Sequence, residues 1–268
     1  MSERRDIPFT NEHFAAWCGK MVGHEYWYGT CGYRATKALL RRKRNRYPKY
    51  YPASMNAKFR QDIAHGEIVA DCIGACKGYA WTGGGEAILA AVGQKGSIPM
   101  KYQANACPDK GANSMFAWAK KQGMPWGSIG TLPDVPGLCL HKDGHVGYTV
   151  GGGFAVEWRG TRWGCVKTAI TERPWTSWFA LPFIDYGNAP LPRHRRTLKH
   201  GSSGAEVKKL QELLNQKGAD LAVDGMFGKL TEAAVRTFQR ENGLKTDGVC
   251  GEKTWEVLVM DPSGAEFI

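Results

Sequence analysis

The chain has 268 residues, a formal net charge of +11 and a hydrophobic content of 43%. This length favours one large domain or two modest ones, and the apolar content is ample for packed cores. No stretch has the length and apolarity of a membrane span, and residues 1–8 lack the apolar core of a signal peptide. We therefore expect synthesis in the cytoplasm, with the eight cysteines present as thiols rather than as a disulfide framework.

The first half of the chain has mainly helical patterns. Thr10 can cap a helix that runs to about Val22, and Asn113 can cap another that ends before Gly123. Strand patterns follow from about Leu138 onward. Helices that precede an antiparallel sheet indicate an α+β fold.

A strongly basic stretch lies within this first half. Ten basic residues and no acidic one occur between Tyr26 and Gln61, and residues 35–40 are helix-like, so we expect a basic helix that ends at the Tyr47-Pro48 step. Such a face would concentrate the protein on an anionic surface. It could also bind nucleic acid, or be a solvated face without a partner.

Cys72 is the first candidate for chemistry. It follows Asp71, a typical N-cap residue, at the start of an apolar segment, which places its sulfur at the first turn of a helix. Unpaired N–H groups and the helix dipole would lower the pKa of a thiol there and favour the nucleophilic thiolate. A small buried cysteine without a role has the same local pattern.

His145 and Glu157 are expected on one β-hairpin. If residues 151–153 form a three-residue turn, Val150 pairs with Phe154, and the two side chains become diagonal neighbours roughly 7–8 Å apart at the backbone. A glutamate can span that distance to an imidazole N–H. The order cysteine, histidine, polar residue is that of a papain-type thiol hydrolase.

Other readings of these residues remain open. His145 could be a structural histidine, and Glu157 could pair with Arg159 or Arg162 instead. Cys139 and His141 are ligand-like, but the set is incomplete for zinc, and they alternate with leucines as on an ordinary strand. We expect no metal and no cofactor.

The chain should divide near residues 188–199, a proline-containing basic linker between residues 1–187 and 200–262. Beyond it, the Asp-Gly turn at Asp224 is echoed 23 residues later at Asp247, and each turn leads through a second glycine into a helix. The apolar spacing predicts three short helices around a small core.

Segments 71–74, 132–138, 144–148 and 156–160 resemble the NlpC-type cysteine peptidases, papain-like enzymes that cut the stem peptides of bacterial peptidoglycan. The resemblance covers most of residues 10–185. It implies Cys72 as nucleophile, His145 as general base, Glu157 as third residue and Tyr26 near the oxyanion site, with Tyr28 as the weaker candidate for that position. This chain departs from the family in having Glu at a position that is commonly His, and in a longer stretch between Tyr26 and Cys72.

Residues 200–262 are similar to the three-helix peptidoglycan-binding domain attached to many wall hydrolases. Together, the two resemblances imply an endolysin-like hydrolase that acts on the wall after release through a holin-type pore. Its partner would be peptidoglycan, and the bond would join D-glutamate to the diamino acid. The alternatives are an N-acetylmuramoyl-L-alanine amidase, or a non-catalytic protein that binds wall or, less expected, nucleic acid. The sequence does not give the oligomeric state.

Overall fold

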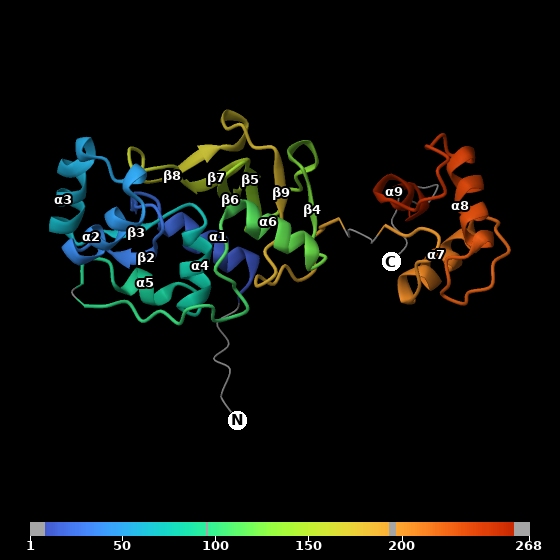
Figure 1. The fold of residues 1–268 in the computed structure, drawn as a ribbon, viewed down its shortest axis with the longest axis horizontal. Coiled ribbons are helices and arrows are strands. Elements are labelled where there is room, and N and C mark those ends of the chain that lie inside the picture. The colour runs from blue at the N-terminus through green and yellow to red at the C-terminus, as the bar shows by residue number, and fades with distance from the viewer. Residues whose placement is uncertain (1–8, 95, 193–196, 260–268) are drawn as a thin grey trace, which may run out of the picture. The chain divides into compact units, whose positions relative to one another are not determined.

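The computed structural model describes residues 9–94, 96–192 and 197–259. The chain divides into two compact units, Met1–Pro192 and Arg193–Ile268, and each unit has its own hydrophobic core. The first unit mixes helices with two sheets, and the second is helical (Figure 1). Within the described ranges, no helix combines the length and apolarity that crossing a membrane requires.

A three-stranded sheet comes early in the chain, where the sequence patterns indicated helices. It contains β1 (Glu25–Tyr26), β2 (Cys31–Arg34) and β3 (Ile68–Ala70) in the order β1-β3-β2. The expectation that strands begin near Leu138 is therefore wrong. These strands have two to four residues, too few to show an alternating pattern.

The basic stretch forms two helices that connect β2 to β3, α2 (Lys37–Arg46) and α3 (Asn56–His65), with 3₁₀ turns at Pro48–Tyr50 and Ala53–Met55 between them. Thr36 caps α2 by accepting a hydrogen bond from the N–H of Leu39. The helix ends before Pro48, as expected, because proline cannot continue it. A separate core cluster beneath these helices contains Trp27, Leu39, Tyr51, Phe59 and Val69.

A six-stranded antiparallel sheet forms the other side of the first unit (Figure 1). Its strands, in the spatial order β4-β9-β5-β6-β7-β8, are β4 (Trp126–Ser128), β9 (Ser177–Phe179), β5 (Cys139–Lys142), β6 (His145–Gly151), β7 (Phe154–Trp158) and β8 (Cys165–Ala169). The 3₁₀ turns Ile129–Thr131 and Ile170–Glu172 follow β4 and β8. The central strand β6 is buried from Val146 to Thr149.

Four helices accompany the sheets: α1 (Asn11–Lys20), α4 (Gly74–Trp81), α5 (Glu86–Ala90) and α6 (Ala112–Lys121). Thr10 caps α1 as expected, with its side chain accepting from the N–H of His13 at 3.2 Å. Asn113 does not cap α6, because that helix begins one residue earlier. Its side chain instead bonds His141, Asp143 and the N–H of Gly144.

The second unit contains the three expected helices, α7 (Ala205–Gln216), α8 (Lys229–Glu241) and α9 (Glu252–Val259). A buried glutamine organises each Asp-Gly turn. Gln211 donates to Asp224 and Thr231 and accepts from the N–H of Gly225.

Gln239 repeats this arrangement with Asp247, Thr254 and the N–H of Gly248. The repeated Asp-Gly sequence therefore corresponds to a repeated hydrogen-bond motif. Because both glutamines are almost fully buried, these bonds fix the turns that set the helices around their core.

Candidate active site

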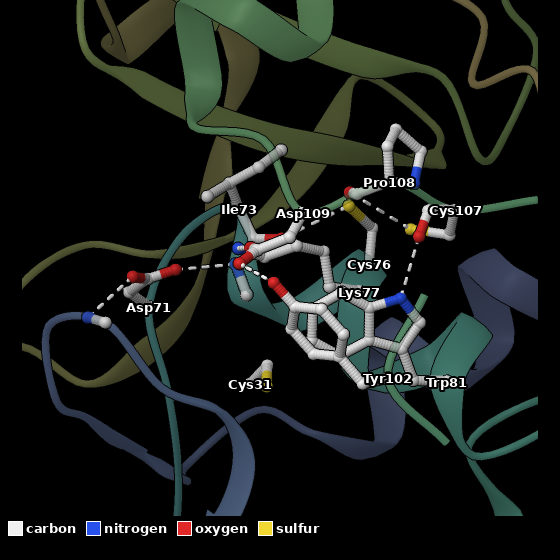
Figure 2. A network of polar contacts seen from close by, with 12 residues as sticks. Cys31, Asp71, Ile73, Cys76, Lys77, Trp81, Tyr102, Cys107, Pro108 and Asp109 are labelled. Carbon is white, nitrogen blue, oxygen red and sulfur yellow. Dashed lines mark hydrogen bonds and ion pairs between the residues drawn. The ribbon is translucent and has the colours of Figure 1, made fainter. Parts of the chain in front are cut away.

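Cys72 lies between the end of β3 and the start of α4. Asp71 acts as the cap of α4, since its Oδ1 accepts from the N–H of Gly74 at 2.5 Å while its Oδ2 accepts from the N–H of Gly29 at 2.7 Å (Figure 2). The regular helix begins at Gly74, and the N–H of Ala75 donates to the carbonyl oxygen of Asp71 at 3.1 Å, so Cys72 lies in the hydrogen-bonded turn that leads into the helix, as expected. Gly74 must be glycine because a Cβ there would lie 1.8 Å from the carbonyl oxygen of Thr30.

The pKa of the Cys72 thiol is raised to about 12, opposite to the lowering expected from a helix N-terminus. Burial is the largest cause, since only 7% of the residue is exposed, and the neighbouring charge of Asp71 adds to it. The backbone N–H groups of Val146 and Ile73 lower the pKa but do not outweigh burial. At neutral pH the sulfur therefore keeps its proton until a base removes it.

Strand β6, which begins with the base candidate His145, lies against the loop that bears Cys72. The N–H of Val146, the residue after His145, is one of the two backbone groups that lower the pKa of Cys72. Tyr148, two positions further along, donates its hydroxyl to the Cys72 carbonyl oxygen at 2.6 Å. The loop that bears Cys72 is thus fixed to the strand that begins with His145.

His145 and Glu157 are in direct contact across β6 and β7. Nε2 of His145 lies 2.8 Å from Oε2 of Glu157. An ionised carboxylate is only an acceptor, so the contact requires the proton on Nε2 and leaves Nδ1 as the acceptor nitrogen of the neutral ring. This tautomer is the one in which Nδ1 can take up a proton.

The hairpin of β6 and β7 has the expected register along its paired strands, but its turn differs from the expected one. Tyr148 pairs with Val156 and Thr149 with Ala155, which places His145 and Glu157 on one face, as expected. At the turn, however, Gly151 rather than Val150 pairs with Phe154, and the register shifts between Thr149 and Gly151. The glycines absorb this irregularity because all three have positive φ.

Glu157 is fully buried and pairs with Arg173, which sequence reasoning missed in favour of Arg159 or Arg162. Arg173 makes a two-pronged contact, with Nε at 2.6 Å and Nη2 at 3.1 Å from the carboxylate oxygens. Burial raises the pKa of Glu157, but the hydrogen bonds from His145 and Arg173 and their charges lower it to about 2. The carboxylate is therefore charged at any pH near neutrality.

Trp175 completes the surroundings of the imidazole. Its ring stacks on His145 with centroids 5.6 Å apart and planes 7° apart. Gly147 makes room for it, since a Cβ at that position would lie 2.9 Å from Cζ2 of Trp175 and 3.3 Å from Cβ of Glu157. Stacking and the hydrogen bond to Glu157 together hold the His145 ring in one orientation.

Tyr26 lies beside this cluster. It pairs with Ala70 in the parallel ladder of β1 and β3, two residues before Cys72. Burial raises the pKa of its hydroxyl well above the usual value, and the charges of Cys72 and Asp71 contribute, so the phenol is a neutral donor near the sulfur. Tyr28, the weaker candidate, stacks on Tyr50 instead.

The other cysteine and histidine candidates have structural surroundings. Cys139 is fully buried, and His141 bonds Asn113 at 2.9 Å. No group of three or more His, Cys, Asp or Glu side chains suited to a metal ion occurs in the part of the chain that the structure describes.

The contact between Glu157 and Arg173 predicts separable effects on rate and stability. Replacing Glu157 by Ala should lower the turnover of the site, because His145 loses its partner. It should also lower the free energy of unfolding by about 3–5 kcal/mol, because the Arg173 charge is left unpaired. Glu157→Gln should lower the rate less.

The double variant Glu157→Ala/Arg173→Met removes both charges and should recover much of the stability but none of the rate. Chemical denaturation and steady-state kinetics measure the two effects. Wild-type turnover in Glu157→Ala would show that the carboxylate has only a structural role. The stabilising charge of Glu157 is fully present above about pH 4.5 and is lost as the pH falls toward about 2.

Residues 203–258 match the family described as "Putative peptidoglycan binding domain". Among curated proteins, the chain is 47% identical over 65 residues to a zinc D-Ala-D-Ala carboxypeptidase of Streptomyces albus G, covering 23% of this chain and 26% of that protein. It is 42% identical over 65 residues to a spore cortex-lytic enzyme of Bacillus cereus, covering 24% and 25%. The matches thus span about a quarter of the length of these relatives.

Among solved structures, the chain is similar to an endolysin of Burkholderia AP3 phage, with 42% identity, a TM-score of 0.25, and coverage of 25% of this chain and 27% of that one. From the family match, the chain contains a peptidoglycan-binding domain, and the curated relatives that share this region are named as a carboxypeptidase and a cortex-lytic enzyme.

Proposed function

We propose that the chain is an endolysin-like peptidoglycan hydrolase, in which a papain-like thiol peptidase within residues 1–187 is joined by a linker, residues 188–199, to the wall-binding domain. The observation that carries the proposal is the arrangement around strand β6. Its first residue, His145, bonds a buried carboxylate, and Tyr148 on the same strand donates its hydroxyl to the carbonyl oxygen of Cys72. The wall-binding domain supplies the class of substrate.

The mechanism begins with proton transfer from Cys72 to Nδ1 of His145. The resulting imidazolium is stabilised by Glu157, whose charge persists at neutral pH. The sulfur then attacks an amide carbonyl carbon, and a new C–S bond forms as the carbonyl becomes an oxyanion. The backbone N–H of Cys72 and the hydroxyl of Tyr26 are the proposed donors to that oxyanion.

His145 next protonates the leaving amine, the C–N bond breaks, and a thioester to Cys72 remains. Water, deprotonated by His145, attacks the thioester and releases the acid product with the thiol restored. Because burial disfavours a free thiolate and raises the pKa of Cys72, the nucleophile forms only when His145 removes the thiol proton.

The proposed bond joins D-glutamate to the diamino acid of the stem peptide. Mass spectrometry of fragments released from peptidoglycan of defined stem sequence tests this assignment. The expected products are a new amino terminus on the diamino acid and a new carboxyl group on D-glutamate. Free stem peptides with an amino terminus on L-alanine, together with a free lactyl carboxyl group on N-acetylmuramic acid, would instead identify an N-acetylmuramoyl-L-alanine amidase.

Removal of the C-terminal unit should separate attachment from chemistry. A protein of residues 1–192 keeps Tyr26, Cys72, His145 and Glu157 and the cores around them, so it should cleave small soluble stem peptides at the full-length rate. On intact walls it should lose about 10²-fold in activity, because the linked domain raises the local substrate concentration.

Turbidity assays on walls and chromatographic assays on peptides measure the two activities. Residues 197–268 alone should sediment with purified walls without hydrolysing them. Equal wall lysis by the truncated and full-length proteins, with no sedimentation of the isolated domain, would contradict this division of roles.

A further inference from the structure

One face of helix α2 carries three cations, and one of them, Lys43, contacts the segment that is hydrogen-bonded to the loop of Cys72. Leu39, Arg42, Lys43 and Arg46 share that face by their spacing of three and four residues. Leu39 is buried, which fixes the orientation of the helix. Arg42 and Arg46 are exposed at the edge of the same face. We call Arg42, Lys43 and Arg46 the α2 cation face.

Hydrogen bonds connect this face to the nucleophile loop. Lys43 donates its ammonium group to the carbonyl oxygen of Gly29, and the N–H of Gly29 donates to Asp71 at 2.7 Å. Asp71 immediately precedes Cys72. Only one residue, Gly29, therefore separates the helix from the loop that bears the sulfur, and Gly29 itself has a left-handed φ of 74° that lets Tyr47 pack closely against it.

Aromatic rings hold the cations in place. The Lys43 ammonium lies 5.8 Å from the Tyr33 ring centre and 5.9 Å from that of Tyr47, and the Arg46 guanidinium lies 5.4 Å from the Tyr47 ring centre. Such contacts order long side chains without neutralising them. The face therefore keeps its positive charge for a ligand.

Lys77, another cation that interacts with Asp71, is already neutralised. Lys77 forms an ion pair with Asp109 at 2.8 Å, and Tyr102 donates to the same carboxylate at 2.6 Å (Figure 2). Among the described residues, by contrast, no acidic side chain forms an ion pair with Arg42, Lys43 or Arg46. The cations of α2 thus differ from Lys77 in that no described acidic side chain forms an ion pair with them, although Lys43 interacts electrostatically with Asp71.

We propose that the α2 cation face is a specificity subsite that binds the free carboxylate of an acidic stem peptide whose scissile amide lies at Cys72. This inference rests on the proposed function and adds the residues that select the substrate's charge. D-Glutamate linked through one carboxyl group retains the other as an anion unless it is amidated. A carboxylate on this face would meet cations that form no ion pair with the acidic side chains the structure describes.

The test uses two soluble probes that differ only at that group, a disaccharide tetrapeptide with a free D-glutamate carboxylate and the same compound with the carboxylate amidated. Full-length protein carrying Cys72→Ala binds without turnover, so calorimetry at low salt gives both dissociation constants whether or not the chain is a hydrolase. We expect tighter binding of the acid, and we expect Arg42→Glu/Arg46→Glu to weaken it about tenfold while leaving the amide unchanged.

The control is Lys37→Glu/Arg41→Glu, which makes the same change in net charge on the opposite side of the same helix, where both residues are exposed. It should bind the acid probe as the parent does. Equal weakening by the two double variants would assign the effect to net charge and overturn the subsite. Equal affinity of the parent for both probes would overturn it too.

A single-stranded oligonucleotide serves as a third probe. Loss of oligonucleotide binding in Arg42→Glu/Arg46→Glu, with unchanged binding of the acid probe, would assign the face to nucleic acid and overturn the proposal. If peptidoglycan hydrolysis fails while the acid probe still binds through this face, the proposed reaction is wrong and the subsite stands.

Discussion

Replacing Cys72 by Ala or Ser should abolish hydrolysis of peptidoglycan while leaving the fold intact. The residue is 7% exposed, and its carbonyl oxygen accepts the hydroxyl of Tyr148 on β6, so loss of the sulfur removes the proposed nucleophile without breaking that contact. A thiol acting with its base typically accounts for several orders of magnitude in rate, and its removal leaves a small remainder from binding and oxyanion stabilisation. Turbidity assays measure lysis, and circular dichroism confirms the fold.

Cys76→Ala is the matched control, because Cys76 lies one helical turn further along α4 and is fully buried. This variant should lose some stability and keep its turnover. Full lytic activity in a folded Cys72→Ala protein would exclude the thiol mechanism.

Replacing His145 by Ala should lower the turnover number by about 10²–10⁴-fold, the range typical of general acid–base catalysis. The variant would lack the base that removes the proton from Cys72, whose pKa is raised. It would also lack the proton donor for the leaving amine. The loss in rate should persist on small soluble peptides, because it concerns chemistry rather than attachment. Steady-state kinetics on a soluble stem peptide measures it.

His141→Ala is the control for this prediction, since His141 lies on the neighbouring strand β5 and bonds Asn113. Its turnover should be close to wild type. A small and equal loss in both histidine variants would mean that His145 supports the sheet rather than the reaction.

The contact between His145 and Glu157 could be predicted because strand side chains alternate with a period of two. The register is set by the body of the hairpin, so the prediction held although the turn itself differs at Val150. The repeated Asp-Gly turns of the second unit could also be predicted, because each joins a fixed turn sequence to the start of a helix.

The partner of Glu157 could not be predicted. Arg173 lies 16 residues away and follows a 3₁₀ turn, so its position depends on the path of the chain between strands β8 and β9. Arg159 and Arg162 were nearer in sequence, but both lie over the ring of Trp163. Proximity in the sequence favoured the wrong arginines because it gives no information about the path of that connection.

The pKa of Cys72 shows a similar limit. A helix N-terminus lowers the pKa of a nearby thiol, but the packing of β6 against the loop buries the sulfur, and burial outweighs the helix. That packing joins residues 76 positions apart through the bond from Tyr148 to Cys72. The expected direction of the pKa shift was therefore wrong because it depends on tertiary packing.

Alkylation of the full-length protein with iodoacetamide, followed in parallel by peptide mass spectrometry and by hydrolysis of a soluble stem peptide, tests the thiol mechanism most directly. All eight cysteines are buried thiols, so modification should be slow except where a base helps to form the thiolate. We predict that activity falls in proportion to the labelling of Cys72, that the other cysteines stay unlabelled over that period, and that stem peptide slows both changes. Full activity in protein whose Cys72 is completely alkylated would contradict the account.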